Sequence, residues 1–161
     1  MKKAILILMV MVPTLALFSL SSCKNDDDVA TDLTYENLTL EDIVSNSNRL
    51  SDEEIEASNS DGYTLNICDV IIYKTNSEHY GKLKILNFDD NENKKLTIKA
   101  VSYNDDGSVF SQTDNLEIRG TWTCDLDAML ESGPNNDFHW QRENGTDTNL
   151  SPIGNAIFAV Y

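Results

Sequence analysis

The sequence predicts an all-β domain: an antiparallel sandwich, or a partly open barrel, of about seven short strands with one or two short helices before them. From Tyr63 onward, β-branched and aromatic residues recur in short runs. Several of these runs alternate apolar and polar residues, as half-buried strands do. Turn-forming residues separate the runs at regular intervals, which is typical of sandwiches and barrels.

The helices are expected between residues 38 and 59. Leu40, Ile43 and Val44 fall at helical spacing, and Thr39 precedes them as an N-cap. Residues 51–54, Ser-Asp-Glu-Glu, match a capping box ahead of Ile55 and predict a second short helix. The turn-forming residues 59–62 end this region, and residues 38–161 are expected to form a single domain.

The strands follow in order. The apolar run at residues 70–73 predicts a strand buried on both faces, within a longer strand over residues 63–75. Residues 81–111 predict an antiparallel meander, because two alternating runs are followed by the hairpin turn at 104–107 and a returning strand at 108–111. Residues 143–149 are turn-rich, and further strands are expected at residues 138–142 and 155–161.

Residues 116–126 alternate over the longest stretch and predict one continuous strand. The residues on its inward face are Leu116, Ile118, Gly120, Trp122, Cys124 and Leu126. Cys124 and Trp122 are therefore expected inside the domain.

The first 22 residues have the pattern of a cleaved signal peptide. Lys2 and Lys3 precede an apolar run over residues 4–12, and Ser21 and Ser22 follow a second apolar run. The alternative is an uncleaved transmembrane helix. Such a helix needs about 20 apolar residues, whereas Pro13 interrupts this run.

The sequence Leu20-Ser21-Ser22-Cys23 resembles the lipobox of bacterial lipoproteins. The resemblance implies that Cys23 becomes the first residue of the mature chain and carries its acyl chains. Several acyl chains hold a protein durably on a membrane, whereas one chain binds only marginally.

The next five residues, Lys24, Asn25, Asp26, Asp27 and Asp28, resemble the export signal of surface-exposed lipoproteins of the Bacteroidota. This resemblance implies a protein anchored in the outer membrane and facing the extracellular side. The alternative is an ordinary solvated charge run. In either case residues 23–37 are expected to be the lipidated N-terminus and an acidic linker.

Two cysteines remain if Cys23 carries lipid, and the compartment implied by the signal peptide is oxidising. A disulfide between Cys68 and Cys124 is therefore expected. The alternative is a pair of buried free thiols.

The charge and the motifs limit the function. The formal net charge is −15, and removal of Lys2 and Lys3 makes it −17, which disfavours nucleic acid and anionic lipid surfaces as partners. Sequence signatures of hydrolases, metalloproteases and nucleotide-binding enzymes are missing, so we expect no enzyme, no cofactor and no metal site. His79 is expected to be solvated in a polar loop. His139 lacks partners that would complete a zinc site.

Asp125 and Asp127 stand two residues apart, near the separation that a retaining glycosidase needs, but they are expected to be exposed at the end of a strand. The expected function is instead a non-catalytic binding or accessory module for a glycan or a protein. The alternatives are a structural surface protein without a small ligand and a small glycan hydrolase.

The candidate ligand-binding residues lie around residues 137–141. Asp137, His139 and Gln141 are expected to point outward along one strand, beside Trp140. Side-chain amides and imidazoles next to an aromatic ring suit the hydroxyl groups of a sugar. Trp140 shares a face with Phe138, a pattern more typical of a core than of a binding site.

Overall fold

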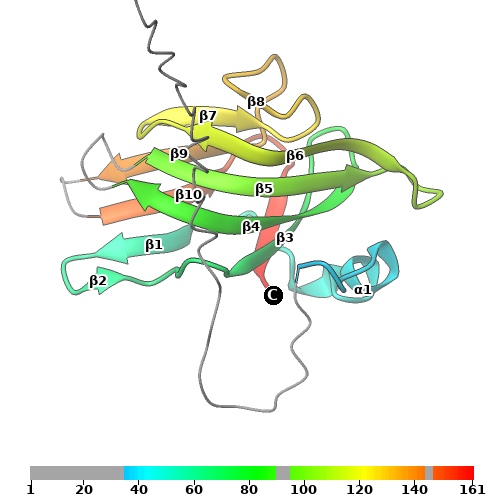
Figure 1. Ribbon diagram of the computed structural model, residues 1–161, viewed down its shortest axis with the longest axis horizontal. Coiled ribbons are helices and arrows are strands. Elements are labelled where there is room, and N and C mark those ends of the chain that lie inside the picture. Colours follow the sequence, from blue (N-terminus) through cyan, green and yellow to red (C-terminus); the bar gives the residue numbers. More distant parts are fainter. Residues whose placement is uncertain (1–34, 90–94, 144–146) are drawn as a thin grey trace, which may run out of the picture.

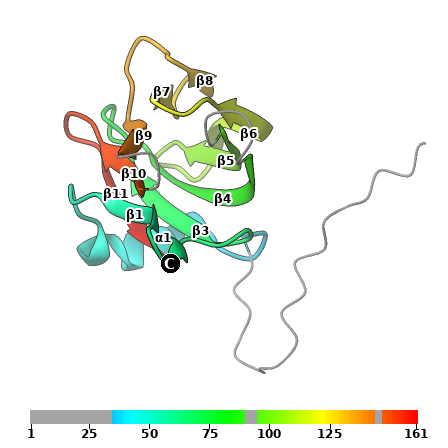
Figure 2. The same cartoon turned by 90° about the vertical axis from the view of Figure 1, so that its left-hand side faces the viewer.

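The computed structural model describes residues 35–89, 95–143 and 147–161, and in it two antiparallel sheets pack face to face (Figures 1 and 2). This confirms the predicted all-β sandwich. The helical elements are α1 (Leu40–Ser45) and the 3-10 turn η1 (Ser47–Arg49). The strands are β1 (Ile55–Asn59), β2 (Gly62–Tyr63), β3 (Val70–Lys74), β4 (Tyr80–Asp89), β5 (Lys95–Tyr103), β6 (Val109–Ile118), β7 (Trp122–Asp125), β8 (Leu130–Glu131), β9 (Phe138–Glu143), β10 (Asp147–Pro152) and β11 (Ile157–Val160).

Each sheet follows a simple antiparallel order. The six-stranded sheet runs β2-β1-β10-β9-β7-β8, and the five-stranded sheet runs β11-β3-β4-β5-β6. Strands β4, β5 and β6 form the meander that residues 81–111 predict. The C-terminal strand β11 pairs with β3 and forms one edge of the smaller sheet.

The core lies between the inner faces of the two sheets. Phe138 and Trp140 of β9 are fully buried there, as are Ile71 and Tyr73 of β3. Phe158 of β11 packs edge-to-face on Phe138, with the ring centroids 5.8 Å apart. Complete burial of a side chain such as phenylalanine contributes about 1.5–3 kcal/mol of transfer free energy. These rings hold the two sheets together.

A third, thinner layer covers part of the outer face of the five-stranded sheet. Leu38 and Ile43 of the N-terminal segment pack there on Ile72 of β3. Lys82 of β4 is buried beneath residues 35–38, and its ammonium donates hydrogen bonds to the carbonyl oxygens of Tyr35 and Leu38. Burial lowers the pKa of Lys82. Packing therefore extends to Tyr35, ahead of the expected domain start at residue 38.

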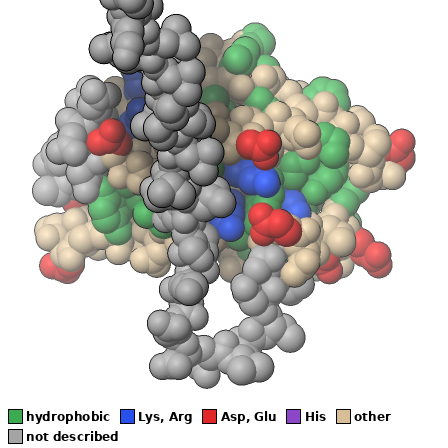
Figure 3. Space-filling view, in the orientation of Figure 1, with side chains coloured by type: hydrophobic (Ala, Val, Ile, Leu, Met, Phe, Trp, Pro, Cys, Tyr) green, Lys and Arg blue, Asp and Glu red, His purple; other side chains and the backbone are tan. Residues whose placement is uncertain are grey.

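The outer face of the five-stranded sheet also carries the basic side chains seen near the middle of Figure 3, with acidic side chains beside them. Lys99 of β5 lies 3.4 Å from Asp114 of β6, and Lys95 lies 3.1 Å from Glu117. These lysines are therefore paired with acids of the neighbouring strand.

One of the two expected helices forms. Thr39 caps α1 as predicted: its hydroxyl accepts the Asp42 N–H at 3.2 Å, and the Asp42 carboxylate accepts the Thr39 N–H at 2.9 Å. The helix predicted from residues 51–54 is wrong. Ser51 instead forms two backbone hydrogen bonds with Phe158 of β11, and β1 begins at Ile55. Long-range pairing has overridden the local capping signal.

Two predicted strands are broken. The strand predicted over residues 63–75 is interrupted, because this region contains only the end of β2 and all of β3. In addition, residues 143–149, which the sequence predicts to be turns, contain the start of β10. The strand predicted over 116–126 divides into β6 and β7, which belong to different sheets. Thr121 stands at the crossing in the left-handed region, with φ 69°. Eleven strands, several of them very short, therefore replace the seven expected among the described residues.

The change of sheet between β6 and β7 also places Trp122 elsewhere than predicted. Ile118, Cys124 and Leu126 are buried as the alternation predicts, but Trp122 is 39% exposed, so its predicted interior position is wrong. It begins β7 at the rim of the sandwich, where the Arg119 guanidinium lies 3.6 Å from the centre of its ring. The same guanidinium forms a bidentate ion pair with Glu131.

The predicted Cys68–Cys124 disulfide is wrong, because Cys124 is a free thiol. Cys124 points inward from β7 into the apolar core, and burial raises its pKa well above the usual thiol value. Cys68 lies in the loop before β3. Its N–H donates to the Ile85 carbonyl of β4 at 2.8 Å, which fixes this loop to the five-stranded sheet, whereas Cys124 belongs to the six-stranded sheet. Alternation predicted the inward direction of Cys124 correctly but could not show that its thiol is free.

Among the residues that the structure describes, no helix has both the length and the apolar character to span a membrane. The predicted signal peptide, the lipidated Cys23 and the export residues 24–28 lie outside the described residues.

Candidate functional site

Two adjoining hollows lie where the β3–β4 turn, the β5–β6 hairpin and α1 meet. The larger has a volume of about 440 Å³ and the smaller about 100 Å³. Tyr80, Asn104 and Asp105 line both, and we call the combined feature the Tyr80 groove. The larger hollow is also lined by Lys74, Ser77, Glu78 and His79, and the smaller by Leu40, Val44 and Tyr103.

A tight turn places His79 at the edge of this groove. The Glu78 N–H donates to the Thr75 carbonyl at 3.0 Å, and the Thr75 N–H donates to the His79 carbonyl at 2.9 Å. Glu78 adopts φ 73°, a left-handed conformation that costs a residue with a side chain about 1–2 kcal/mol. Strain of this kind tends to gather at functional sites, where the surrounding structure maintains it.

The His79 ring is held between a carboxylate and an aromatic ring. Its Nδ1 lies 3.0 Å from Asp127 Oδ1, and its plane stacks on Phe110 with a centroid distance of 3.9 Å. Phe110 is the additional residue of a β-bulge, because Ser111 pairs with Ser102 whereas Val109 pairs with Tyr103. Bulges commonly redirect a side chain at a functional site, and this one occurs where Phe110 meets His79.

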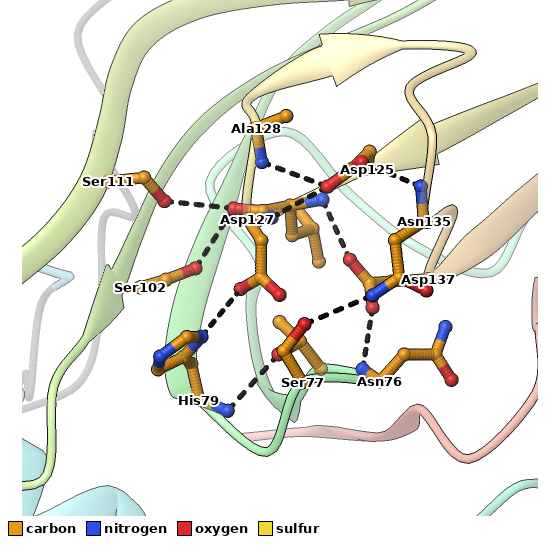
Figure 4. Close-up of polar contacts among 12 residues, drawn as sticks. Asn76, Ser77, His79, Ser102, Ser111, Asp125, Asp127, Ala128, Asn135 and Asp137 are labelled. Carbon is orange, nitrogen blue, oxygen red and sulfur yellow. Dashed lines mark hydrogen bonds and ion pairs between the residues drawn. The ribbon is translucent and has the colours of Figure 1, made fainter.

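The carboxylate also sets the tautomer of His79. An ionised carboxylate can only accept a hydrogen bond, so Nδ1 carries a proton and Nε2 of the neutral ring is an acceptor. In Figure 4 the second ring nitrogen points away from Asp127. The expectation that His79 is solvated is wrong, because its side chain is only 22% exposed. Local sequence could not reveal this, since Asp127 lies 48 residues further along the chain.

Two further carboxylates, those of Asp125 and Asp137, fix the loops near His79 (Figure 4). Asp125 accepts the N–H groups of Asp127, Ala128 and Asn135 at 3.1, 2.8 and 2.9 Å. Asp137 accepts the N–H groups of Asn76 and Leu126 at 2.7 and 2.8 Å. No described residue offers these loop N–H groups a backbone carbonyl to bind, and the two carboxylates act as their acceptors instead.

Burial raises the pKa of Asp137 to about 6. The two N–H groups oppose this shift, and the negative charges of Asp127 and Asp125 add to it. Asp127 Oδ2 is buried without a hydrogen-bond partner within the described part of the chain. The Asp137 site thus carries an electrostatic cost that its hydrogen bonds only partly offset.

The pair Asp125 and Asp127 does not form the exposed site considered from the sequence. Asp125 is buried and its carboxylate already accepts three N–H groups, so it cannot approach a substrate in the groove. Within residues 35–89, 95–143 and 147–161, no three His, Cys, Asp or Glu side chains are placed to hold a metal ion.

The four predicted ligand-binding residues do not share one surface. Asp137 and Trp140 are fully buried, so the outward position expected for Asp137 is wrong and Trp140 belongs to the core. His139 and Gln141 are half-buried on β9, where they pair across the sheet with Ser151 and Asn149 of β10. None of the four lines the Tyr80 groove.

The fold and the groove define the class of protein as a small antiparallel β-sandwich with a mixed polar and aromatic hollow at one end. Comparisons of the chain with protein-family models, with curated proteins and with solved structures found no match.

Proposed function

We propose that this chain is a lipid-anchored protein of the bacterial outer surface whose domain binds a neutral glycan without catalysis. The observation that carries the binding proposal is the Tyr80 groove, which joins aromatic rings to hydrogen-bonding groups on a firmly held scaffold. Rigid β-scaffolds commonly present binding residues on the loops at their ends.

The anchor proposal rests on the sequence. The apolar run that ends in Leu20-Ser21-Ser22-Cys23 resembles a lipoprotein signal, and residues 24–28 resemble a surface-export signal. Acyl chains on Cys23 would hold the chain in the outer membrane, and the polar residues after it would act as a linker.

The chemistry of the groove suits a neutral, polyhydroxylated ligand. Tyr80 contributes an aromatic ring, and the stacked pair of His79 and Phe110 stands at the edge of the groove. Ser77 and Asn104 add groups that both donate and accept hydrogen bonds. Lys74 lies 3.4 Å from Glu78, so its charge is largely matched within the groove. The strongly acidic chain disfavours an anionic ligand.

The loops around the groove are held before any ligand arrives. Asn76, in the β3–β4 turn, donates from its side chain to the Asn136 carbonyl at 2.8 Å and accepts the Asn155 N–H at 2.6 Å. Its own N–H donates to Asp137. One residue therefore connects loops of both sheets, and a site ordered in advance loses less entropy on binding.

Two measurements test the anchor. A Cys23→Ala chain is expected to lose incorporation of labelled palmitate, and labelling that persists would contradict lipidation. Replacement of Asp26, Asp27 and Asp28 by alanine is expected to leave the protein facing the periplasm. Protease digestion of intact cells measures this, and equal digestion of the parent and the variant would remove the export role.

A glycan array tests the binding, using the full-length chain purified from membranes in detergent. Tyr80→Ala is expected to weaken binding about tenfold or more, because aromatic rings in binding sites contribute strongly. The matched control is Gln141→Ala, since Gln141 lies on β9 outside the groove. Undiminished binding by Tyr80→Ala would exclude the groove. If no glycan binds at millimolar concentration, the structural surface protein becomes the better proposal.

A further inference from the structure

The smaller hollow of the Tyr80 groove differs in chemistry from the larger one. Leu40 and Val44 of α1 line it together with Tyr80 and Tyr103. The larger hollow is lined instead by Lys74, Ser77, Glu78 and His79 in addition to the shared residues. A ligand that fills both must therefore be polar over most of its length and apolar at one point.

The size of the smaller hollow limits that apolar point. Its volume is about 100 Å³. One water molecule takes up about 30 Å³ in the liquid, so the hollow has room for roughly three or four heavy atoms. A pyranose ring is too large for it, whereas an acetamido group, with four heavy atoms, is of the right size.

The boundary between the hollows offers partners for an amide. Asn104 and Asp105 line both sides of it. The Asn104 side-chain nitrogen donates to Ser108 Oγ at 2.9 Å, which positions the amide and leaves its second hydrogen available to a ligand carbonyl. The Asp105 carboxylate can accept the N–H of a ligand amide. A methyl group beyond that amide would then reach Leu40 and Val44.

The apolar wall is in place before binding. Thr39 caps α1, and Ile43 anchors the helix to the sheet, so the helix positions Leu40 and Val44. Val44 is nevertheless 44% exposed, although a valine gains free energy when its apolar surface is buried. A ligand methyl group would cover part of this surface.

From these observations we infer that the Tyr80 groove selects a neutral sugar bearing an N-acetyl group, with the sugar ring in the larger hollow and the acetyl methyl against Leu40 and Val44. This inference rests on the proposed glycan-binding function and specifies its ligand. Since one methyl-sized contact in an apolar pocket discriminates ligands by about tenfold or more, we expect at least that preference over the matching sugar without the acetamido group.

The experiment compares affinities for the full-length chain in detergent. The probes are the tetramers of β-1,4-linked N-acetylglucosamine, glucosamine and glucose. The N-acetylated tetramer is expected to bind at least about tenfold more tightly than the glucose tetramer. Val44→Gln is expected to reduce this preference to about threefold or less, because it places an amide where the methyl group packs. The control is Val160→Gln, a comparably exposed valine on β11 that lines neither hollow, and its preference is expected to be unchanged.

The outcomes separate this inference from the proposed function. Equal binding of the glucose and N-acetylglucosamine tetramers, weakened by Tyr80→Ala, would overturn the N-acetyl preference and leave glycan binding in place. A preference that survives Val44→Gln would overturn the assignment of the acetyl group to the smaller hollow. Tighter binding of the cationic glucosamine tetramer would show that charge, and not the acetyl group, determines selection. No binding of any tetramer or array glycan would overturn both proposals.

Discussion

A substitution at Asp137 is the most direct test of the carboxylate network formed by Asp125, Asp127 and Asp137. The Asp137 carboxylate is fully buried, and its pKa is raised from 3.8 to about 6. A shift of that size corresponds to about 3 kcal/mol of free energy between the two protonation states. The folded domain therefore favours the protonated acid more strongly than the unfolded chain does.

The sign of the pH dependence follows from the direction of this shift. The stabilising contribution of Asp137 is fully present below about pH 4, the ordinary pKa of an aspartate, and is lost as the pH rises through about 6. Asparagine does not titrate, but it has one acceptor oxygen, and its amide nitrogen cannot accept the second of the two N–H groups that Asp137 binds. The Asp137→Asn variant is therefore expected to be less stable than the parent by about 1–3 kcal/mol near pH 4 and to recover about 2 kcal/mol of that difference by pH 7.5.

Urea unfolding followed by tryptophan fluorescence, at a series of pH values between 4 and 8, measures this difference. The other acids titrate in both proteins, so the difference between the two curves isolates Asp137. If the two stabilities run parallel over that range, the buried carboxylate is not electrostatically costly and the reasoning is wrong.

Three further predictions concern the scaffold. Gly81→Ala is expected to lower the free energy of unfolding by about 2–3 kcal/mol, measured by urea titration, because a Cβ at Gly81 would lie 2.3 Å from the buried Tyr73 ring; an unchanged midpoint would contradict this. Lys82→Met keeps the aliphatic stem but removes two hydrogen bonds to residues 35–38, so amide exchange in that segment is expected to accelerate while the β4 amides stay protected. Cys124 is expected to resist iodoacetamide in the folded protein and to react in guanidinium chloride; rapid native labelling would argue against its burial.

The features that the sequence predicted correctly are those determined by neighbouring residues. Thr39 caps α1 by accepting the N–H of Asp42, three residues further along the chain. The β5–β6 hairpin turns at residues 104–107, where Gly107 adopts φ 84°. In the apolar run at residues 70–73, Ile71, Ile72 and Tyr73 are fully buried because their strand is covered on both faces. In each case the short-range signal and the final fold agree.

The features that the sequence missed depend on contacts between distant segments. Ser51 carries a local helix signal, but its backbone pairs with Phe158 at the other end of the domain. Trp122 alternates with buried residues, yet it lies at the rim because the chain changes sheets beside it. Most of the candidate site falls in this group, since the His79–Asp127 pair and the bulge at Phe110 appear only once the sandwich is assembled.

The buried Lys82 has a mechanical consequence. In a chain held at Cys23 by acyl groups, a pull from the anchor enters the described fold at residues 35–38, which Lys82 fastens to β4. Strand β4 lies in the middle of its sheet, between β3 and β5, so the load falls on an interior strand with neighbours on both sides. An edge strand would instead peel away one hydrogen bond at a time. If Cys23 carries the proposed acyl chains, the pull would therefore reach the fold at a strand that resists unzipping under shear.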